Sequence, residues 1–344
     1  MTRMADRGRR APVSPRVGRA LLIALAVATV LAPWLAPHRA GEQLADRAYA
    51  PPTRIRLHDA TGWHAPFFHP QTMTDRLRRT FTVDAGTRVP VVVGRGALVQ
   101  SAAVDQSLLL LGADSLGRDV FARTVLGARW SLGVTLLGAA GALVLGAMFG
   151  AFAAVAGGRT ERWLMRVADF VLVVPAVYLI LVLRALLPPV LSTWNVFALM
   201  SLLFSLAAWP HVARGVRAIV TVELGRDYAE AARAAGASRW RVVGHVLPSA
   251  YGFLTAELTL LVPALLSAEA AVSYLGLGFP EPTPSWGTML QEASNVRVLT
   301  EAPWMLAPAA ALFVVVLALQ LVGARASTRA VFFDSLASHV SDPS

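Results

Sequence analysis

Residues Ser131–Ala156 read SLGVTLLGAAGALVLGAMFGAFAAVA, an apolar run without a single charged side chain. A helix needs about 20 mostly apolar residues to cross the hydrocarbon core of a membrane, where its backbone must satisfy its own hydrogen bonds. The run is therefore long enough to span a membrane. Its glycines predict one small-residue face that packs closely against another helix. They are Gly133, Gly138, Gly141, Gly146 and Gly150, the last two forming a GxxxG step.

The composition of the whole chain agrees with a lipid environment. The 344 residues are 56% hydrophobic and 15% charged, whereas soluble domains carry about 25% charged residues. The net charge of +10 resembles that of a nucleic-acid binder, but the basic residues lie between apolar runs and form no compact patch. All of them are arginine, so the chain has no lysine for an ATP-binding phosphate loop. It has no cysteine, which leaves its redox compartment open.

Five further apolar runs complete a prediction of six transmembrane helices in an all-α membrane protein. They are Ala20–Ala36, Trp163–Leu187, Val196–Val216, Phe253–Leu277 and Trp304–Ala324. The joints 157–166 and 211–250 are rich in arginine, which predicts a cytoplasmic location. Joint 188–194 is uncharged and joint 278–303 is mostly acidic, so both are predicted outside. Both termini are then cytoplasmic.

The predicted regions follow from these spans. Residues 1–36 form an arginine-rich cytoplasmic start and the first helix, although a cleaved signal peptide is the alternative. Pro33, Trp34 and Pro37 make a poor cleavage site, which favours the uncleaved helix. Residues 131–324 form a five-helix core with a cytoplasmic loop at 219–250, and residues 325–344 form a cytoplasmic tail.

The segment 37–130 is predicted to be a small external subdomain. Arg88–Val93 and Ser107–Leu111 resemble strands, and Trp63, Phe67 and Phe68 suggest a small core. The histidines of this segment, His58, His64 and His69, could suggest a metal site, but histidines in solvated loops are far commoner than histidine ligands of a metal. We therefore predict no metal site, and no arrangement of residues indicates a catalytic centre.

The cytoplasmic stretch 227–248 reads DYAEAARAAGASRWRVVGHVLP, with two helix-favouring halves split at Gly236. We expect a helix–turn–helix, because glycine permits the positive φ that a tight reversal needs. The small side chains of Ala231, Ala232, Ala234 and Ala235 would let another surface approach, with Glu230 as a charged end. An ordinary amphipathic connector is the alternative reading.

This loop resembles the one shared by inner-membrane permeases of binding-protein-dependent ABC importers. Glu230-Ala231-Ala232, Gly236 and Leu247-Pro248 match its pattern. Further stretches are similar to the dipeptide, oligopeptide and nickel branch of that family. They are LGADSLGRDV at 111–120, GARWSL at 127–132, LGLG at 275–278, PTPSWGTML at 282–290 and APW at 302–304. Together the matches cover about 110–324.

The resemblance implies a type I importer permease in the bacterial inner membrane, forming half of a translocation path. It implies a homologous partner permease, two cytoplasmic ATPases and an external solute-binding protein, around a subunit embedded in lipid. ATP would be used by the partner ATPase, and this chain would bind no cofactor. The implied ATPase-docking residues are Tyr228, Glu230, Ala231, Ala232, Gly236, Leu247 and Pro248.

Other residues carry weaker expectations. Pro175 and Pro263 interrupt predicted spans and serve either packing or gating. Glu269 is costly in lipid and is a candidate for the lining of the path. Asp169, Arg184 and Glu257 are also charged residues within predicted spans. An external structural motif of ion pairs and helix capping is predicted at Asp114, Gly117, Arg118 and Asp119, with contact to the binding protein as the alternative.

Two other classes of function compete with an importer permease. A self-sufficient secondary transporter would usually show internal repeats and a charged residue near mid-membrane in a broken helix, and neither is evident. A structural membrane anchor would not need the 227–248 loop. The sequence does not name the solute, and peptides, nickel chelates and oligosaccharides all remain open, with di- or oligopeptides preferred.

Overall fold

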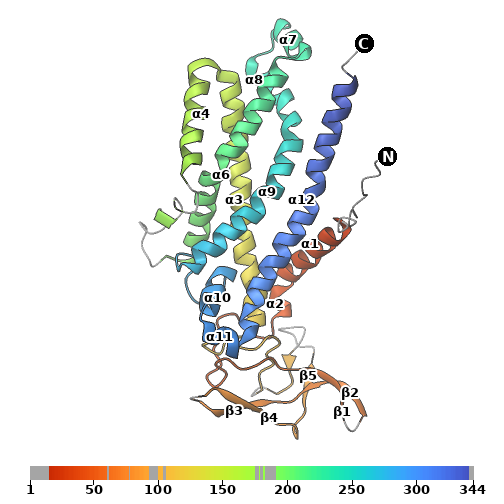
Figure 1. Ribbon diagram of the computed structural model, residues 1–344, viewed down its shortest axis with the longest axis vertical. Helices are drawn as coiled ribbons and strands as arrows, with labels where there is room; N and C mark the ends of the chain where they lie inside the picture. Colours follow the sequence, from red (N-terminus) through yellow and green to blue (C-terminus); the bar gives the residue numbers. More distant parts are fainter. Residues whose placement is uncertain are drawn as a thin grey trace, which may run out of the picture.

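The structure is a computed structural model that describes residues 15–59, 62–76, 78–92, 100–103, 106–174, 178, 181–182 and 191–340. Long helices run side by side, and a small group of strands lies beyond one end of them (Figure 1). The helices are α1 (Pro15–Val30), α2 (Ala32–Leu35), α3 (Val120–Ala156), α4 (Gly158–Val173), α6 (Thr193–Leu224), α7 (Asp227–Ala234), α8 (Arg239–Val246), α9 (Tyr251–Tyr274), α10 (Trp286–Ala293), α11 (Val296–Glu301) and α12 (Ala307–Val340), with short 3₁₀ turns at Leu247–Ala250 and Pro303–Leu306.

The strands occupy the segment predicted to be a small subdomain. They are β1 (Arg56–Asp59), β2 (Gly62–Phe68), β3 (Gln71–Asp75), β4 (Thr80–Val83), β5 (Val89–Val92) and β6 (Gln100–Ser101). One antiparallel sheet has the order β1-β2-β5-β6, and β3 pairs with β4 as a separate hairpin. Phe68, Val89 and Leu108 form a small buried cluster beneath these strands.

Two details of this segment differ from the prediction. Ser107–Leu111 is not a strand. The Leu109 carbonyl accepts from the backbone N–H of Thr53 at 2.7 Å and from that of Gly112 at 3.3 Å, and the Leu109 N–H donates to the Thr53 hydroxyl, so no ladder forms. Trp63 lies outside the core with 79% of its surface exposed, whereas Phe67 and Phe68 are buried. The predicted core is therefore present without its tryptophan.

The centre of the bundle is the close contact between α3 and α6. A β-carbon added at Gly133, Gly138, Gly141, Gly146 or Gly150 would meet side-chain or backbone atoms of α6, whereas one at Gly127, the sixth glycine of α3, would meet Pro284 and Ser285. At Gly146 such an atom would lie 2.3 Å from the Val212 β-carbon, and at Gly150 it would lie 2.5 Å from the Ala213 carbonyl oxygen. The small-residue face therefore serves helix packing, as predicted.

The bundle begins earlier than the apolar run alone predicted. Helix α3 starts at Val120 rather than Ser131, because the Asp119 carboxylate caps it by accepting from the backbone N–H groups of Phe121 and Ala122. Likewise α12 continues to Val340, so the predicted tail begins as helix.

Among the described residues, four helical stretches are long and apolar enough to cross a membrane: Val120–Ala156, Thr193–Leu224, Arg239–Tyr274 and Pro303–Gly323. The remaining two predicted spans stay predictions. Helices α1 and α4 each have 16 residues, about 24 Å of helix, which is shorter than the hydrocarbon core. The rest of the predicted third span, including Pro175 and Arg184, falls largely outside the described residues.

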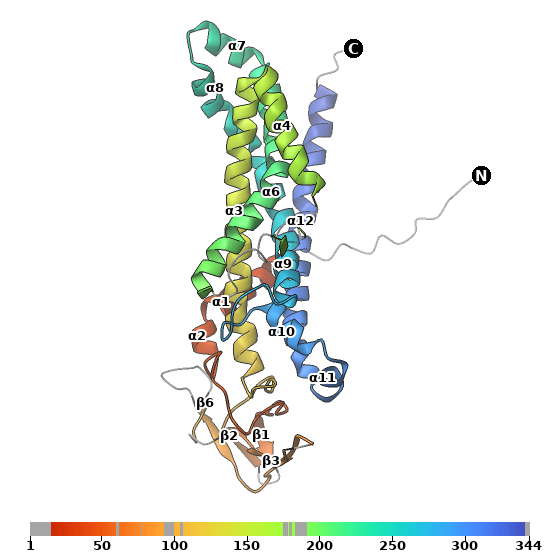
Figure 2. The same ribbon diagram turned by 90° about the vertical axis from the view of Figure 1, so that its left-hand side faces the viewer.

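The two ends of the bundle differ in what they carry. Helices α7 and α8 lie at one end, near the C-terminus, and the strands lie at the other end together with α10 and α11 (Figures 1 and 2). The loop at 227–248 and the sheet subdomain are therefore separated by the full length of the helices.

Candidate functional site

The 227–248 loop is a helix–turn–helix in which α8 is anchored and α7 is exposed. Val242, Val243 and Val246 of α8 are buried in the main core, and Trp240 stacks on Phe152 of α3 with ring centroids 5.8 Å apart. In α7 only Ala229 is buried. The loop therefore stands on the bundle through its second helix and presents its first helix outward.

Gly236 makes the reversal between these helices. Its φ is +86°, in the left-handed region that L side chains rarely adopt, and the Ala237 N–H donates to the Ala232 carbonyl as α7 ends. A β-carbon at Gly236 would meet nothing within 4 Å. Glycine is needed here for its backbone conformation and not for lack of space.

Hydrogen bonds fix the base of α7 to the end of α6. The Tyr228 hydroxyl donates to the Glu223 carboxylate at 2.6 Å, which raises the pKa of Tyr228, and Arg226 pairs with the same carboxylate at 2.9 Å. Arg233 donates to the Leu224 carbonyl at 2.9 Å. A displacement of α7 would therefore be transmitted directly to α6.

The outward surface of the loop carries small, aromatic and charged side chains. Ala231, Ala234 and Ala235 are exposed, and the Glu230 side chain is 67% exposed. Tyr228 is about half exposed. Leu247 is half-buried against the core and begins the 3₁₀ turn that leads into α9, and Pro248 is the second residue of that turn. Exposed apolar groups ringed by charges are typical of a surface that binds another protein.

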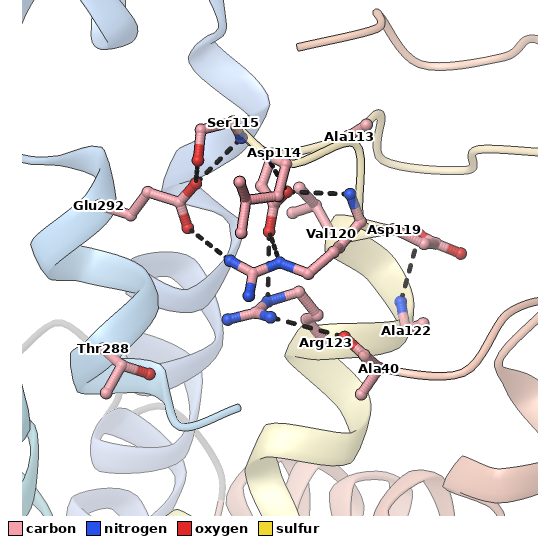
Figure 3. Close-up of polar contacts among 12 residues, drawn as sticks. Ala40, Ala113, Asp114, Ser115, Asp119, Val120, Ala122, Arg123, Thr288 and Glu292 are labelled. Atoms are coloured by element: carbon pink, nitrogen blue, oxygen red, sulfur yellow. Dashed lines mark hydrogen bonds and ion pairs between the residues drawn. The ribbon is translucent and has the colours of Figure 1, made fainter. Parts of the chain in front are cut away.

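At the opposite end, a buried ion cluster joins the start of α3 to the 281–292 segment (Figure 3). Asp114, Arg118 and Arg123 are almost fully buried. The Arg118 guanidinium lies 2.6 Å from Asp114, 3.4 Å from Glu292 and also pairs with Glu281. Burial by itself lowers the pKa of Arg118. The three carboxylates together raise this pKa by more than burial lowers it, so the net pKa lies above its ordinary value.

Gly117 and Arg123 complete this cluster. Gly117 has φ +75°, and a β-carbon there would lie 2.2 Å from the Leu44 carbonyl oxygen, so no larger residue fits. Arg123 lies within 3.6 Å of both Asp114 and Glu281. The sequence analysis singled out Asp114, Gly117, Arg118 and Asp119. It gave Arg123 no role, and it used Glu281 and Glu292 only as charges that set orientation.

Glu269 is fully buried near the end of α9. One carboxylate oxygen accepts from the Ser273 hydroxyl at 2.7 Å, and the other has no hydrogen-bond partner among the residues described. Ser131 of α3 lies nearby and accepts from the Trp286 N–H at the start of α10. In this conformation of the chain Glu269 therefore lies inside a helix junction, and its place in a path stays a prediction.

The remaining candidates are scattered. Pro263 is buried in α9, and Asp169 pairs with Arg214 at the surface between α4 and α6. His64 lies 3.1 Å from Asp59, and the His69 ring bonds the Thr87 carbonyl. The polar side chains among them therefore have local partners, and the structure does not bring these residues together at a common site.

Comparison with known proteins identifies one matching family and several similar proteins. Residues 142–330 match the family described as binding-protein-dependent transport system inner membrane component. The oligopeptide transport system permease protein OppC of Bacillus subtilis (strain 168) is 36% identical over 196 residues, which cover 57% of this chain and 62% of that protein. OppC of Lactococcus lactis subsp. cremoris (strain SK11) is 32% identical over 216 residues, covering 62% and 72%.

Two further comparisons extend the picture. A putative peptide permease protein of Brucella ovis is 36% identical over 214 residues, covering 62% of this chain and 69% of that protein. A chain of the MetNI methionine ABC transporter, solved in inward-facing conformations, superposes with a TM-score of 0.47 and 22% identity over 60% of this chain and 95% of that chain.

The fold and the loop define a multi-pass, mostly helical membrane protein of the permease class. Since the family match covers more than half of its residues, the chain belongs to the binding-protein-dependent transport system inner membrane components. The predicted resemblance to ABC importer permeases of the peptide branch is therefore confirmed. This is a family of transporter permeases and not of enzymes.

Proposed function

We propose that this chain is the permease subunit of an ATP-driven importer of di- or oligopeptides. It forms half of the translocation path and binds no cofactor, while ATP is used by a separate ATPase on the cytoplasmic face. The observation that carries the proposal is the α7–α8 loop in a chain of this family: α8 is anchored in the core and α7 is exposed. A movement of the ATPase would pass through α7 to α6.

The topology that fits this role has six transmembrane helices and both termini in the cytoplasm. The predicted spans Ala20–Ala36, which includes most of α1, and Trp163–Leu187, which begins in α4, would complete the four long ones. Segment 37–130 then forms the external subdomain. The separation of the strands from α7 and α8 along the bundle supports this orientation (Figure 2).

Cysteine labelling would test the orientation directly, because the natural chain has no cysteine. We expect Trp63→Cys, which replaces an exposed side chain, to react with a membrane-impermeant maleimide from outside intact cells. Ala235→Cys, also exposed, should react only after the membrane is opened. External reaction at Ala235 or protection at Trp63 in intact cells would overturn the topology.

The partners follow from the same proposal. One subunit with one docking loop offers half of what two ATPases require, so a homologous permease should complete the path. A heterodimer fits the peptide branch better than a homodimer. An external solute-binding protein would deliver the peptide.

Reconstitution would test the function as a whole. The chain is purified with a candidate partner permease, ATPases and a binding protein from the same organism, and is placed in proteoliposomes. We expect peptide uptake that requires ATP and every subunit. Uptake driven by an ion gradient without ATPases would identify a secondary transporter instead, and full uptake with this chain as the sole permease would refute the heterodimer.

A further inference from the structure

A cleft of about 340 Å³ lies between the tip of the β3–β4 hairpin and α11. We call it the arginine cleft. Arg78 and Arg79 from the hairpin line one wall, and Asn295, Arg297 and Glu301 line the other, with Tyr49 between them. These elements come from opposite ends of the sequence. The cleft therefore exists only because the sheet subdomain docks beside the last part of the chain.

Three guanidinium groups face a single carboxylate in this cleft. Glu301 is already paired with Arg297 at 2.9 Å, and Arg79 lies over the Tyr49 ring at 4.5 Å from its centroid. No acceptor for the Arg78 guanidinium is found among the described residues. The cleft thus has an excess of positive charge and room for further carboxylates.

The backbone also holds an unusual conformation here. Tyr49 has φ +54° and Arg79 has φ +52°, and they are the two non-glycine residues with positive φ in the described part of the chain. Such conformations are unfavourable for residues with a side chain and persist where the surrounding structure enforces them. Both residues line the same cleft and contact each other, so the hairpin tip is held with Arg79 over Tyr49.

We propose that the arginine cleft receives carboxylate side chains from an acidic patch on the external solute-binding protein. This rests on the proposed function, which places the strand end of the bundle outside. A binding protein must approach that end, where the β3–β4 hairpin and α11 both lie (Figure 1).

Exposure decides between a protein and a small acidic solute. The side chains of Arg78, Arg79 and Arg297 are exposed, and an exposed ion pair contributes only about 0–1 kcal/mol. A single free carboxylate would gain too little to be held. A protein surface that presents several carboxylates at once gains steering during encounter, which speeds association more than it slows dissociation.

The test measures how fast the binding protein associates with the assembled transporter in lipid nanodiscs. The variant Arg78→Gln/Arg79→Asn removes two charges and keeps a residue that tolerates positive φ at position 79. Arg76→Gln is the matched control, since Arg76 lies on the same hairpin but outside the cleft and pairs with Asp46. Arg297→Gln removes a charge from the opposite wall and does not depend on the hairpin folding correctly.

We expect the association rate constant of the double variant to fall about tenfold at low ionic strength. Arg297→Gln should also slow association, and the control should stay within about twofold. The difference should vanish at high salt, because screening removes steering. Octaglutamate should compete with the binding protein for the cleft of the wild-type complex, and uncharged octaserine should not.

Wild-type rates in both cleft variants, or a loss that persists unchanged at high salt, would overturn the proposal. The proposed function fails separately, because it predicts ATP-dependent uptake by the wild-type complex irrespective of these variants. Transport at saturating binding protein should be nearly normal in all of them, since docking is slowed and the pathway is intact.

Discussion

Gly236→Val is expected to abolish most peptide uptake while leaving membrane insertion and helix packing unchanged. The position has φ +86° and open space around it, so the added side chain causes no clash. The harm comes from the backbone, because a β-branched residue resists the left-handed conformation at a cost of about 1–3 kcal/mol. The turn would open, and α7 would leave the position in which the proposed function has it dock the ATPase.

Matched variants separate this explanation from a general loss of stability. Gly236→Asn should retain most uptake, because asparagine tolerates positive φ. Gly244→Ala should be neutral, because this glycine of α8 does not have a positive φ and an added β-carbon would meet nothing within 4 Å. Glu230→Lys should reduce ATPase co-purification by reversing an exposed charge. Wild-type uptake and ATPase binding in both Gly236→Val and Glu230→Lys would reduce the loop to a connector.

Gly146→Leu should have the opposite profile: it should disrupt the folded chain itself. Even the first added atom would lie 2.3 Å from Val212 and 2.9 Å from the Trp209 carbonyl oxygen, which belongs to the α6 backbone and cannot rotate away. Forcing extra atoms into a packed core costs about 1–3 kcal/mol or more. We expect a fall in melting temperature on the order of 5 °C or more, with loss of monodisperse protein in detergent.

Gly252→Ala is the control for this change, because a β-carbon there meets nothing within 4 Å although the residue is also in a helix of the bundle. Its melting temperature should match that of the wild type. An unchanged melting temperature for Gly146→Leu would mean that α3 and α6 do not depend on their close approach. The two glycines thus serve different ends, Gly236 by its dihedral angle and Gly146 by its lack of volume.

Local chemistry explains which parts of the structure the sequence could predict. The glycine face of α3 and the reversal at Gly236 depend on one residue type and its spacing, so both could be predicted from the sequence. The start of α3 was missed because hydropathy registers apolar runs, whereas the helix begins at a polar cap, Asp119. An acidic residue just before Val120 was the available signal.

The ion cluster around Arg118 could not be predicted from spacing. Arg118 reaches Glu281 and Glu292 over sequence separations of 163 and 174 residues. No periodicity links residues so distant, and their pairing follows from how the helices fold together. Trp63 shows the converse error: an aromatic residue was assigned to the core by type, whereas its position in β2 points it to solvent, where His58 contacts its ring.

The same separations bear on how the chain is made. Ribosomes add about 5–20 residues per second, so Asp114 and Arg118 emerge roughly 10–30 seconds before Glu281. During that interval the arginine has only Asp114 from this cluster as a carboxylate partner, so the start of α3 lacks two of its three carboxylate contacts. Synthesis of the acidic 281–292 segment supplies them. Truncation before Glu281 would therefore leave a nascent chain that quality-control proteases should recognise, even though its first helices are already inserted.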